Sequence, residues 1–257
     1  MSSAKLSVVI ITKNEARNIA RCLDTAIPVA DEILVVDSFS TDNTIEICTQ
    51  YKIRFVQTQW QGYTQTKNYA NSLAQYDWIL SLDADEVLDK SLQDSILAEK
   101  SNSFPAEGYS IRRLPYYCGK PIYYSNWNPD VKVRLFNRTK AQWQGAFIHE
   151  TIVFSKPLKP ALLSGLCHHF TMHSIEDHLN TINRFTTLQA LERIKQNQKT
   201  TWIDFTIKPL FEFFKSYWIK KGFLDGRYGL IISMMNAYSR FLRAAKVYQL
   251  RNSSTPK

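Results

Sequence analysis

The first hundred residues alternate between strand-like apolar runs and helix-like stripes, and this alternation limits the possible folds more than any other feature. Residues 6–11 form a nearly continuous β-branched and apolar run, which is typical of a strand buried on both faces. Apolar residues then recur at 16, 19, 20 and 23, the spacing of one helix face. Three further strand-like runs follow at residues 33–36, 54–58 and 78–82, with helical segments between them. Such β–α units predict a parallel, doubly wound sheet with right-handed crossovers.

After residue 108 the pattern changes to short alternating strands, and then to helices. The strands are predicted at residues 109–114, 131–136 and 151–154. Ser174, three residues before Asp177, is a candidate cap for a helix that runs to about residue 195. Two more helices are predicted at 209–221 and 225–250, with Gly222 as the stop between them. We therefore expect an α/β domain at residues 1–175, with halves at 1–100 and 101–175, and a helical region at 176–257.

The net charge of +9 lies mostly near the C-terminus. Residues 201–257 contain ten Lys or Arg and three Asp or Glu, a net charge of +7. Because this charge sits on apolar helices rather than on an interleaved basic and aromatic strand face, it disfavours nucleic acid as the partner. Four scattered cysteines without a Cys-x-x-Cys pair indicate a reducing compartment. We see neither a signal peptide nor a transmembrane span, so we expect a cytoplasmic protein.

Polar clusters follow the predicted parallel strands where ligands bind in such sheets, beyond the carboxyl ends. The triplet Asp83-Ala84-Asp85 directly follows the apolar run at 78–82. Two carboxylates at the end of a buried strand require a positive charge, and a hard divalent cation on a phosphate meets that need. No glycine precedes Gly62, which excludes a P-loop or a Gly-x-Gly-x-x-Gly turn after the first strand. Lys67 can supply a further cation for the phosphates.

Four segments in this order resemble family 2 glycosyltransferases of the GT-A fold: residues 7–15, 33–44, 65–70 and 78–86. The resemblance implies a nucleotide-binding half at 1–100 and an acceptor-side half at 101–175. It also implies that Asp83 and Asp85 bracket Mg²⁺ or Mn²⁺ on the diphosphate of a UDP-sugar. The residues it assigns to the nucleotide sugar are Thr12, Asn14, Glu15, Asp37, Lys67, Asn68 and Asp83. Asp37 could instead cap the following turn, Lys67 could be a solvated helix charge, and Asp42 is better explained as a cap.

The rest of the chain is similar to lipopolysaccharide core β-glucosyltransferases that act on the first heptose of the inner core. This second resemblance rests on residues 133–136, 147–150 and 208–226, with His169 and Ser174. It implies transfer of a hexose, most simply glucose, from a UDP-sugar to a heptose. Donor and acceptor identity change easily within one fold, so another sugar donor or acceptor in cell-surface polysaccharide assembly stays open. A non-catalytic nucleotide-sugar binder is a further alternative.

The chemistry expected is a displacement at the anomeric carbon with inversion, in which a carboxylate deprotonates the acceptor hydroxyl. Glu150 is the preferred base and Asp130 the alternative. His169 is a candidate third metal ligand, because adjacent strand side chains diverge and only one of His168 and His169 can point inward. Arg134 and His149 are candidate acceptor contacts, although a structural ion pair or a core hydrogen bond would also explain them.

The helix predicted at 209–221 is aromatic and apolar, with a narrow polar stripe. One interpretation is a helix packed on the catalytic domain. The preferred one is binding at a membrane surface, with aromatic side chains at the headgroup level beside Lys220 and Lys221. The aromatic residues concerned are Phe213, Phe214, Tyr217 and Trp218. We therefore expect a peripheral protein on the cytoplasmic face of a bacterial inner membrane, acting on a glycolipid acceptor.

Overall fold

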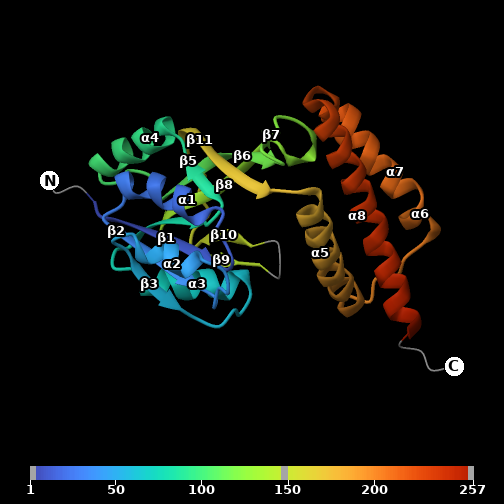
Figure 1. The fold of residues 1–257 in the computed structure, drawn as a ribbon, viewed down its shortest axis with the longest axis horizontal. Coiled ribbons are helices and arrows are strands. Elements are labelled where there is room, and N and C mark those ends of the chain that lie inside the picture. The colour runs from blue at the N-terminus through green and yellow to red at the C-terminus, as the bar shows by residue number, and fades with distance from the viewer. Residues whose placement is uncertain (1–3, 146–149, 254–257) are drawn as a thin grey trace. The chain divides into compact units, whose positions relative to one another are not determined.

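The computed structural model describes residues 4–145 and 150–253, and the chain divides into two compact units. The first, called the α/β unit here, comprises Met1–Leu114 and Asp130–Phe170. The second, the helical unit, comprises Pro115–Pro129 and Thr171–Lys257. Residues 115–129 therefore belong with helices that lie much later in the sequence (Figure 1).

The parallel half of the α/β unit forms as the sequence predicts. Its strands pair in the order β3-β2-β1-β4, and each pair is parallel. Their bounds are β1 (Leu6–Thr12), β2 (Glu32–Asp37), β3 (Arg54–Gln57) and β4 (Trp78–Asp83). All seven residues of β1 are buried, as expected for a strand with helices on both faces. The register pairs Thr12 with Asp37 and Ile11 with Asp83, so the polar strand ends lie side by side.

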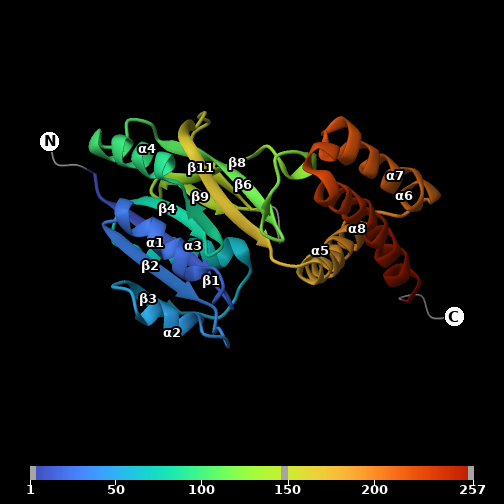
Figure 2. The same ribbon diagram turned by 45° about the horizontal axis from the view of Figure 1, so that its top comes forward.

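Helices cover both faces of this sheet (Figure 2). One face buries Val8 and Ile10 against α1 (Ile19–Ala26), α2 (Thr44–Thr49) and α4 (Lys90–Ser101). The other face buries Val9 and Ile11 against α3 (Tyr63–Leu73) and the hairpin of β9 (Ala141–Gln144) and β10 (Thr151–Phe154). The alternating side chains of β1 thus enter two separate cores, which fixes its register.

Antiparallel strands extend the same sheet beyond β4. The bounds are β5 (Glu86–Leu88), β6 (Gly108–Tyr117), β7 (Lys120–Pro121), β8 (Asp130–Asn137) and β11 (Ala161–Met172). Within the described residues the sheet continues from β4 in the order β8-β6-β11-β5, with β7 on β6. The sequence pattern did not predict β11, which runs to Met172 between the last expected strand and the helix capped by Ser174. Its residues Cys167, His168 and His169 pair with β5, which starts one residue after the acidic triplet.

The helical unit contains α5 (Ile175–Lys195), α6 (Trp202–Phe205), α7 (Ile207–Phe214) and α8 (Gly226–Ser253), with short turns η2 (Ser125–Trp127), η3 (Lys215–Ile219) and η4 (Gly222–Asp225). The predicted cap is confirmed: the Ser174 hydroxyl accepts a hydrogen bond from the Asp177 N–H at 3.0 Å. The helix predicted at 209–221 starts earlier and changes to a π-helical turn at Lys215. Among the described helices, none has the length and apolar character needed to cross a bilayer.

Candidate active site

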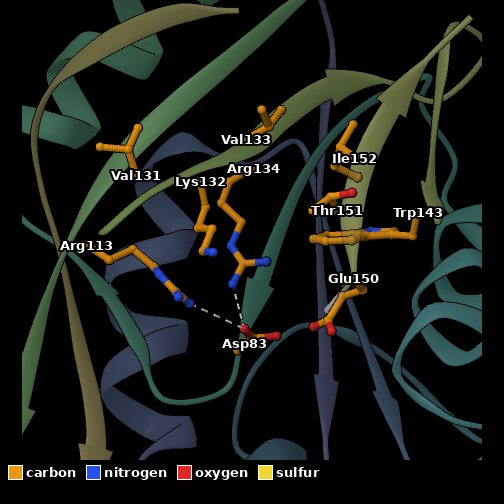
Figure 3. Close-up of a pocket in the computed structure, with 10 residues that line it drawn as sticks. All are labelled: Asp83, Arg113, Val131, Lys132, Val133, Arg134, Trp143, Glu150, Thr151 and Ile152. Carbon is orange, nitrogen blue, oxygen red and sulfur yellow. Dashed lines mark hydrogen bonds and ion pairs between the residues drawn. The ribbon is translucent and has the colours of Figure 1, made fainter. Parts of the chain in front are cut away.

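The acidic triplet lies at the carboxyl end of β4, where its first carboxylate is surrounded by cations (Figure 3). The Asp83 Oδ1 atom is 2.9 Å from Lys67 Nζ, and its Oδ2 atom is 2.6 Å from an Arg134 terminal nitrogen. An Arg113 nitrogen lies 3.9 Å from the same Oδ2. Burial alone would raise the pKa of Asp83, but these three cations hold it well below its usual range. These contacts favour the charged form of Asp83.

Glu86 positions both Arg113 and Arg134. Its side chain is 0% exposed, and its Oε1 accepts hydrogen bonds from Arg113 at 2.8 Å and Arg134 at 2.6 Å. Its other oxygen accepts the Asp83 N–H at 3.0 Å. A buried carboxylate shared by two guanidinium groups holds both side chains in place. Removing it would leave two buried positive charges short of a partner.

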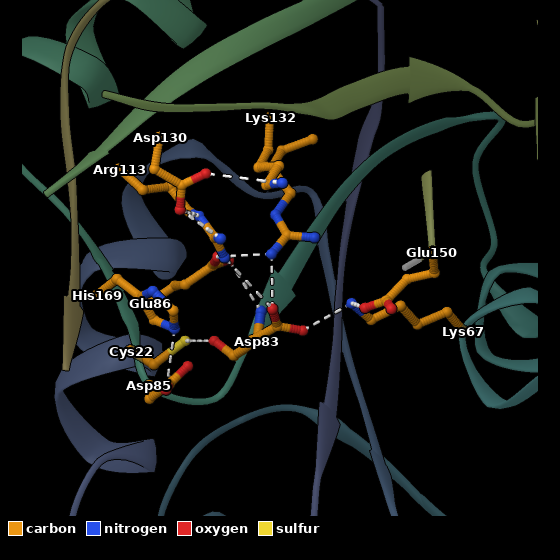
Figure 4. Close-up of polar contacts among 11 residues, drawn as sticks. Cys22, Lys67, Asp83, Asp85, Glu86, Arg113, Asp130, Lys132, Glu150 and His169 are labelled. Atoms are coloured by element: carbon orange, nitrogen blue, oxygen red, sulfur yellow. Dashed lines mark hydrogen bonds and ion pairs between the residues drawn. The ribbon is translucent and has the colours of Figure 1, made fainter. Parts of the chain in front are cut away.

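The second aspartate of the triplet faces a histidine. Asp85 Oδ2 is 3.2 Å from His169 Nε2, and both side chains are mostly buried. Although burial acts against the charged form of each group, their attraction lowers the pKa of Asp85 and raises that of His169 (Figure 4). The antiparallel pairing of β11 with β5 brings His169 to this position. The structure thus brings Asp85 and His169 together, while Asp83 forms its ion pairs with Lys67 and Arg134.

The edge formed by β1 and β2 contains two buried hydroxyls, those of Thr12 and Ser38. Thr12 and Ser38 are neighbours, since the Ser38 N–H donates to the Thr12 carbonyl at 2.9 Å. Both side-chain oxygens are buried without a hydrogen-bond partner among the described residues. Buried hydroxyls are normally hydrogen-bonded, and these two lie at the carboxyl ends of parallel strands, where such sheets usually bind ligands. Sequence reasoning did not select Ser38, although its place after Asp37 could have suggested it.

The predicted nucleotide residues around that edge serve partly to hold the loops. The Asp37 carboxylate is fully buried and accepts hydrogen bonds from Ser40 and Gln57. Asn14, whose φ is 55°, accepts the Thr41 N–H at 2.7 Å. Burial and the nearby Asp85 carboxylate raise the pKa of Glu15 to about 7. Asp42 accepts the N–H of Thr44, the first residue of α2.

Lys67 enters the site from α3 and is only 1% exposed. Besides Asp83, its ammonium contacts Glu150 Oε1 at 3.3 Å and lies 4.4 Å from the centre of the Trp143 ring. Asn68 fixes that tryptophan, because its side-chain amide both donates to the Trp143 carbonyl and accepts the Trp143 N–H. A buried ammonium held by two carboxylates and an aromatic face is positioned rigidly, unlike a solvated helix charge.

A cavity of about 390 Å³ opens above these groups. That volume is in the range of small-molecule sites. Figure 3 shows Glu150 on one side of it and Arg113 on the other, with Asp83 and Arg134 between them. Its lining is completed by Val131, Lys132, Val133, Trp143, Thr151 and Ile152. Charged groups thus converge on one space from β4, β6, β8 and the residue before β10.

The two candidate bases differ in their surroundings. Asp130 accepts two hydrogen bonds from Arg113, at 2.8 and 2.5 Å, and lies 3.7 Å from Lys132 (Figure 4). Glu150 lines the cavity, with one oxygen beside Lys67. His149, the predicted acceptor contact beside it, lies outside the described residues.

Arg113 and Trp143 belong to the site but were not predicted. The register of β6 and β8 places Arg113 directly opposite Asp130, so an antiparallel alignment of those strands would have found it. Within the described residues, no group of three or more His, Cys, Asp or Glu side chains is arranged to hold a metal.

A doubly wound sheet with an acidic triplet after β4, extended by antiparallel strands over a polar cavity, defines a GT-A glycosyltransferase fold. The model of the family described as glycosyl transferase family 2 matches residues 7–166. The chain belongs to this family and is a glycosyltransferase.

Relatives match over nearly the whole chain. A Rickettsia felis protein named "Uncharacterized glycosyltransferase" is 35% identical over 95% of this chain and 89% of its own length. LpsC of Rhizobium meliloti, named a lipopolysaccharide core biosynthesis glycosyltransferase, is 29% identical over 95% of this chain and 92% of its own. A solved structure of S. aureus TarS with UDP-GlcNAc has a TM-score of 0.48 and 14% identity, covering 98% of this chain and 93% of that one.

Proposed function

We propose that this glycosyltransferase moves a hexose, most simply glucose, from a UDP-sugar to a heptose of a lipopolysaccharide core, with inversion. The observation that carries the proposal is the acidic triplet, in which Asp83 is held by three cations while Asp85 faces His169. The name of the Rhizobium meliloti relative, LpsC, supports the class of acceptor. Residues 1–100 would bind the donor, 101–175 the acceptor, and 176–257 the membrane that carries it.

On the donor side, the hydroxyls of Thr12 and Ser38, which have no hydrogen-bond partner in the described part of the chain, would hydrogen-bond the nucleoside. Asp37, Asn14 and Glu15 would shape this edge through the loops that they hold. Lys67, anchored beside Trp143 by Asn68, would face the diphosphate. Their common location at the carboxyl ends of parallel strands supports this assignment.

Asp85 and His169 fit a divalent cation. A carboxylate and an imidazole 3.2 Å apart can ligate one ion, and Mg²⁺ or Mn²⁺ commonly binds one or two carboxylates while substrate phosphates and water complete the shell. An imidazole ligand favours Mn²⁺ over Mg²⁺. When bound, such an ion supplies Lewis-acid stabilisation of the negative charge on the UDP leaving group. Asp83, already paired with Lys67 and Arg134, would act mainly by fixing those cations.

On the acceptor side, Glu150 would remove the proton from the attacking hydroxyl as that oxygen bonds to the anomeric carbon and the bond to the diphosphate breaks. Glu150 lines the cavity, whereas Asp130 is held by two hydrogen bonds from Arg113, so Glu150 is the better-placed base. Arg134, fixed by Glu86 and Asp83, would border the acceptor. His149 keeps its proposed role as an acceptor contact.

The acceptor would be a glycolipid presented from a bilayer. Basic residues concentrate in the last 57 residues of the chain, which agrees with peripheral binding to the cytoplasmic face of an inner membrane.

The test is a thermal-shift series with UDP- and GDP-sugars, in the presence of Mn²⁺, Mg²⁺ or a chelator, on the wild type and Asp85→Ala. We expect a UDP-sugar to raise the melting temperature of the wild type only with a divalent ion, and the rise to disappear in Asp85→Ala. The proposal fails if no nucleotide sugar stabilises the wild type with either ion. A larger shift with another nucleotide sugar would identify a different donor and would leave the assignment of the binding site unchanged.

The base is tested by turnover of Glu150→Gln and the matched variant Asp130→Asn. General-base catalysis contributes about 10²–10⁴-fold, so Glu150→Gln should lose activity in that range while still binding the donor. If Asp130→Asn loses more than Glu150→Gln, the roles of the two carboxylates are reversed.

A further inference from the structure

Hydrogen bonds connect two segments of the helical unit that lie far apart in the sequence. The Asp225 carboxylate, in η4, accepts the N–H of Tyr123 at 3.1 Å and the N–H of Tyr124 at 2.9 Å. One residue further on, the Ser125 N–H donates to the Lys220 carbonyl at 2.9 Å. Three backbone N–H groups of the loop after β7 thus donate hydrogen bonds to this region, two to the Asp225 side chain and one to the Lys220 carbonyl.

The residues at this junction include aromatic, apolar and basic side chains that are exposed to solvent. Tyr123 is 56% exposed, Trp218 54% and Leu224 53%, and Tyr124 is exposed as well. Lys220 and Lys221 are exposed between the apolar positions. We call these six residues the aromatic–lysine surface. Exposed apolar groups gathered in this way usually mark an interaction site.

We propose that the aromatic–lysine surface docks on the headgroup region of an anionic lipid bilayer, with Asp225 holding the two tyrosines in place for that contact. Tyrosine and tryptophan combine an apolar body with a polar tip, which suits the boundary between acyl chains and headgroups. The two lysines face lipid phosphates. This inference rests on the proposed glycolipid acceptor, and it adds a specific docking surface that includes a loop far from the C-terminal helices in sequence.

The charge of this region favours a bilayer over a second copy of the chain. Residues 201–257 have a net charge of +7. A two-fold contact would place the same patch of both copies face to face, so the lysine pairs would repel one another. An anionic bilayer instead attracts each lysine. The exposed α7 residues Leu210 and Phe211 add apolar surface to the same unit.

The experiment measures flotation of the full-length protein with vesicles of phosphatidylethanolamine and phosphatidylglycerol, and with phosphatidylcholine vesicles. We compare the wild type with the double variant Lys220→Glu/Lys221→Glu and with Leu224→Glu. The matched control is Leu191→Glu, an exposed leucine on α5. Loss of one lysine weakens binding to an anionic surface about fivefold, so the double variant should bind at least about 25-fold more weakly.

We expect Leu224→Glu to weaken binding too, Leu191→Glu to bind like the wild type, and phosphatidylcholine to bind all proteins poorly. Equal binding by the wild type and the double variant would overturn the proposal. So would a wild-type dimer that the double variant converts to monomers. Thermal shift with UDP-sugar on the same samples separates the two claims: a wild type that binds the donor but no vesicle refutes only the docking surface, whereas vesicle binding without donor binding refutes the proposed reaction.

Discussion

The α/β unit and the helical unit depart from the usual distribution of side chains in opposite ways. The α/β unit buries charged groups, among them Lys67, Glu86 and Arg134. The helical unit leaves large apolar groups in solvent, with Trp202 and Leu210 the most exposed. Buried charges and exposed apolar clusters are both costly for a protein whose only task is to fold. These departures are the observations on which the two proposals above rest: a charged substrate for the α/β unit and a lipid surface for the helical unit.

The largest effect on stability is expected from the buried charges. Glu86→Gln leaves Arg113 and Arg134 without the carboxylate that they share, and breaking a buried pair in this way costs about 3–5 kcal/mol. Urea unfolding measures the loss. The matched control is Glu107→Gln, because Glu107 pairs with Lys140 at 2.7 Å in a half-exposed position and should contribute at most about 1 kcal/mol. Equal losses in the two variants would show that the buried network is not a special feature of the α/β unit.

The parallel half and the location of its site were predictable because the signals are local. Helix and strand periods can be read within a short window, and topology then places ligands at the carboxyl ends of the strands. These local signals were sufficient to select the triplet with Asp83 and Asp85 as a candidate ligand site. Lys67 was also within reach, since α3 directly precedes β4.

The antiparallel half was less predictable because its contacts depend on register between distant strands. Arg113 meets Asp130 only through the pairing of β6 with β8, and one of these strands contains a register shift after Tyr109. Nothing in either segment alone fixes such a pairing, and a slip of one residue would reverse the direction of every side chain. The pairing of Tyr123 and Tyr124 with Asp225 spans about a hundred residues and has no local signal either.

A smaller, pH-dependent effect is expected at Glu15. Because its pKa is raised to about 7 from a usual 4.5, the folded protein keeps a proton there that the unfolded chain releases. The resulting stabilisation is complete below about pH 4.5 and is lost as the pH rises to about 7. Linkage puts it at about 3 kcal/mol at most. Glu15→Gln should remove this slope in urea unfolding at a series of pH values with a chelator present.

Asp204 in the helical unit provides the matched control, because its pKa is shifted in the opposite direction from that of Glu15. Burial alone would raise the pKa of Asp204, but hydrogen bonds from Lys208 and Thr201 lower it to about 2. Its stabilisation is complete above about pH 4 and is lost as the pH falls toward 2. Asp204→Asn should therefore keep the wild-type slope between pH 4.5 and 7. Parallel profiles for the wild type and Glu15→Gln would mean that Glu15 carries no such proton.

The smallest effect on stability is expected where apolar side chains are exposed. Leu210 on α7 is 71% exposed, so Leu210→Ser removes little buried area and should change the free energy of unfolding by no more than about 0.5 kcal/mol. The control Leu80→Ser, in the core of β4, should cost several times more, because it opens a cavity and buries a hydroxyl. Urea unfolding compares the two. A large loss in Leu210→Ser would mean that α7 is stabilised by packing of this leucine, and the contrast between the units would then not hold for the helix. A neutral result means that folding does not require an apolar residue at this position, as the contrast between the two units predicts.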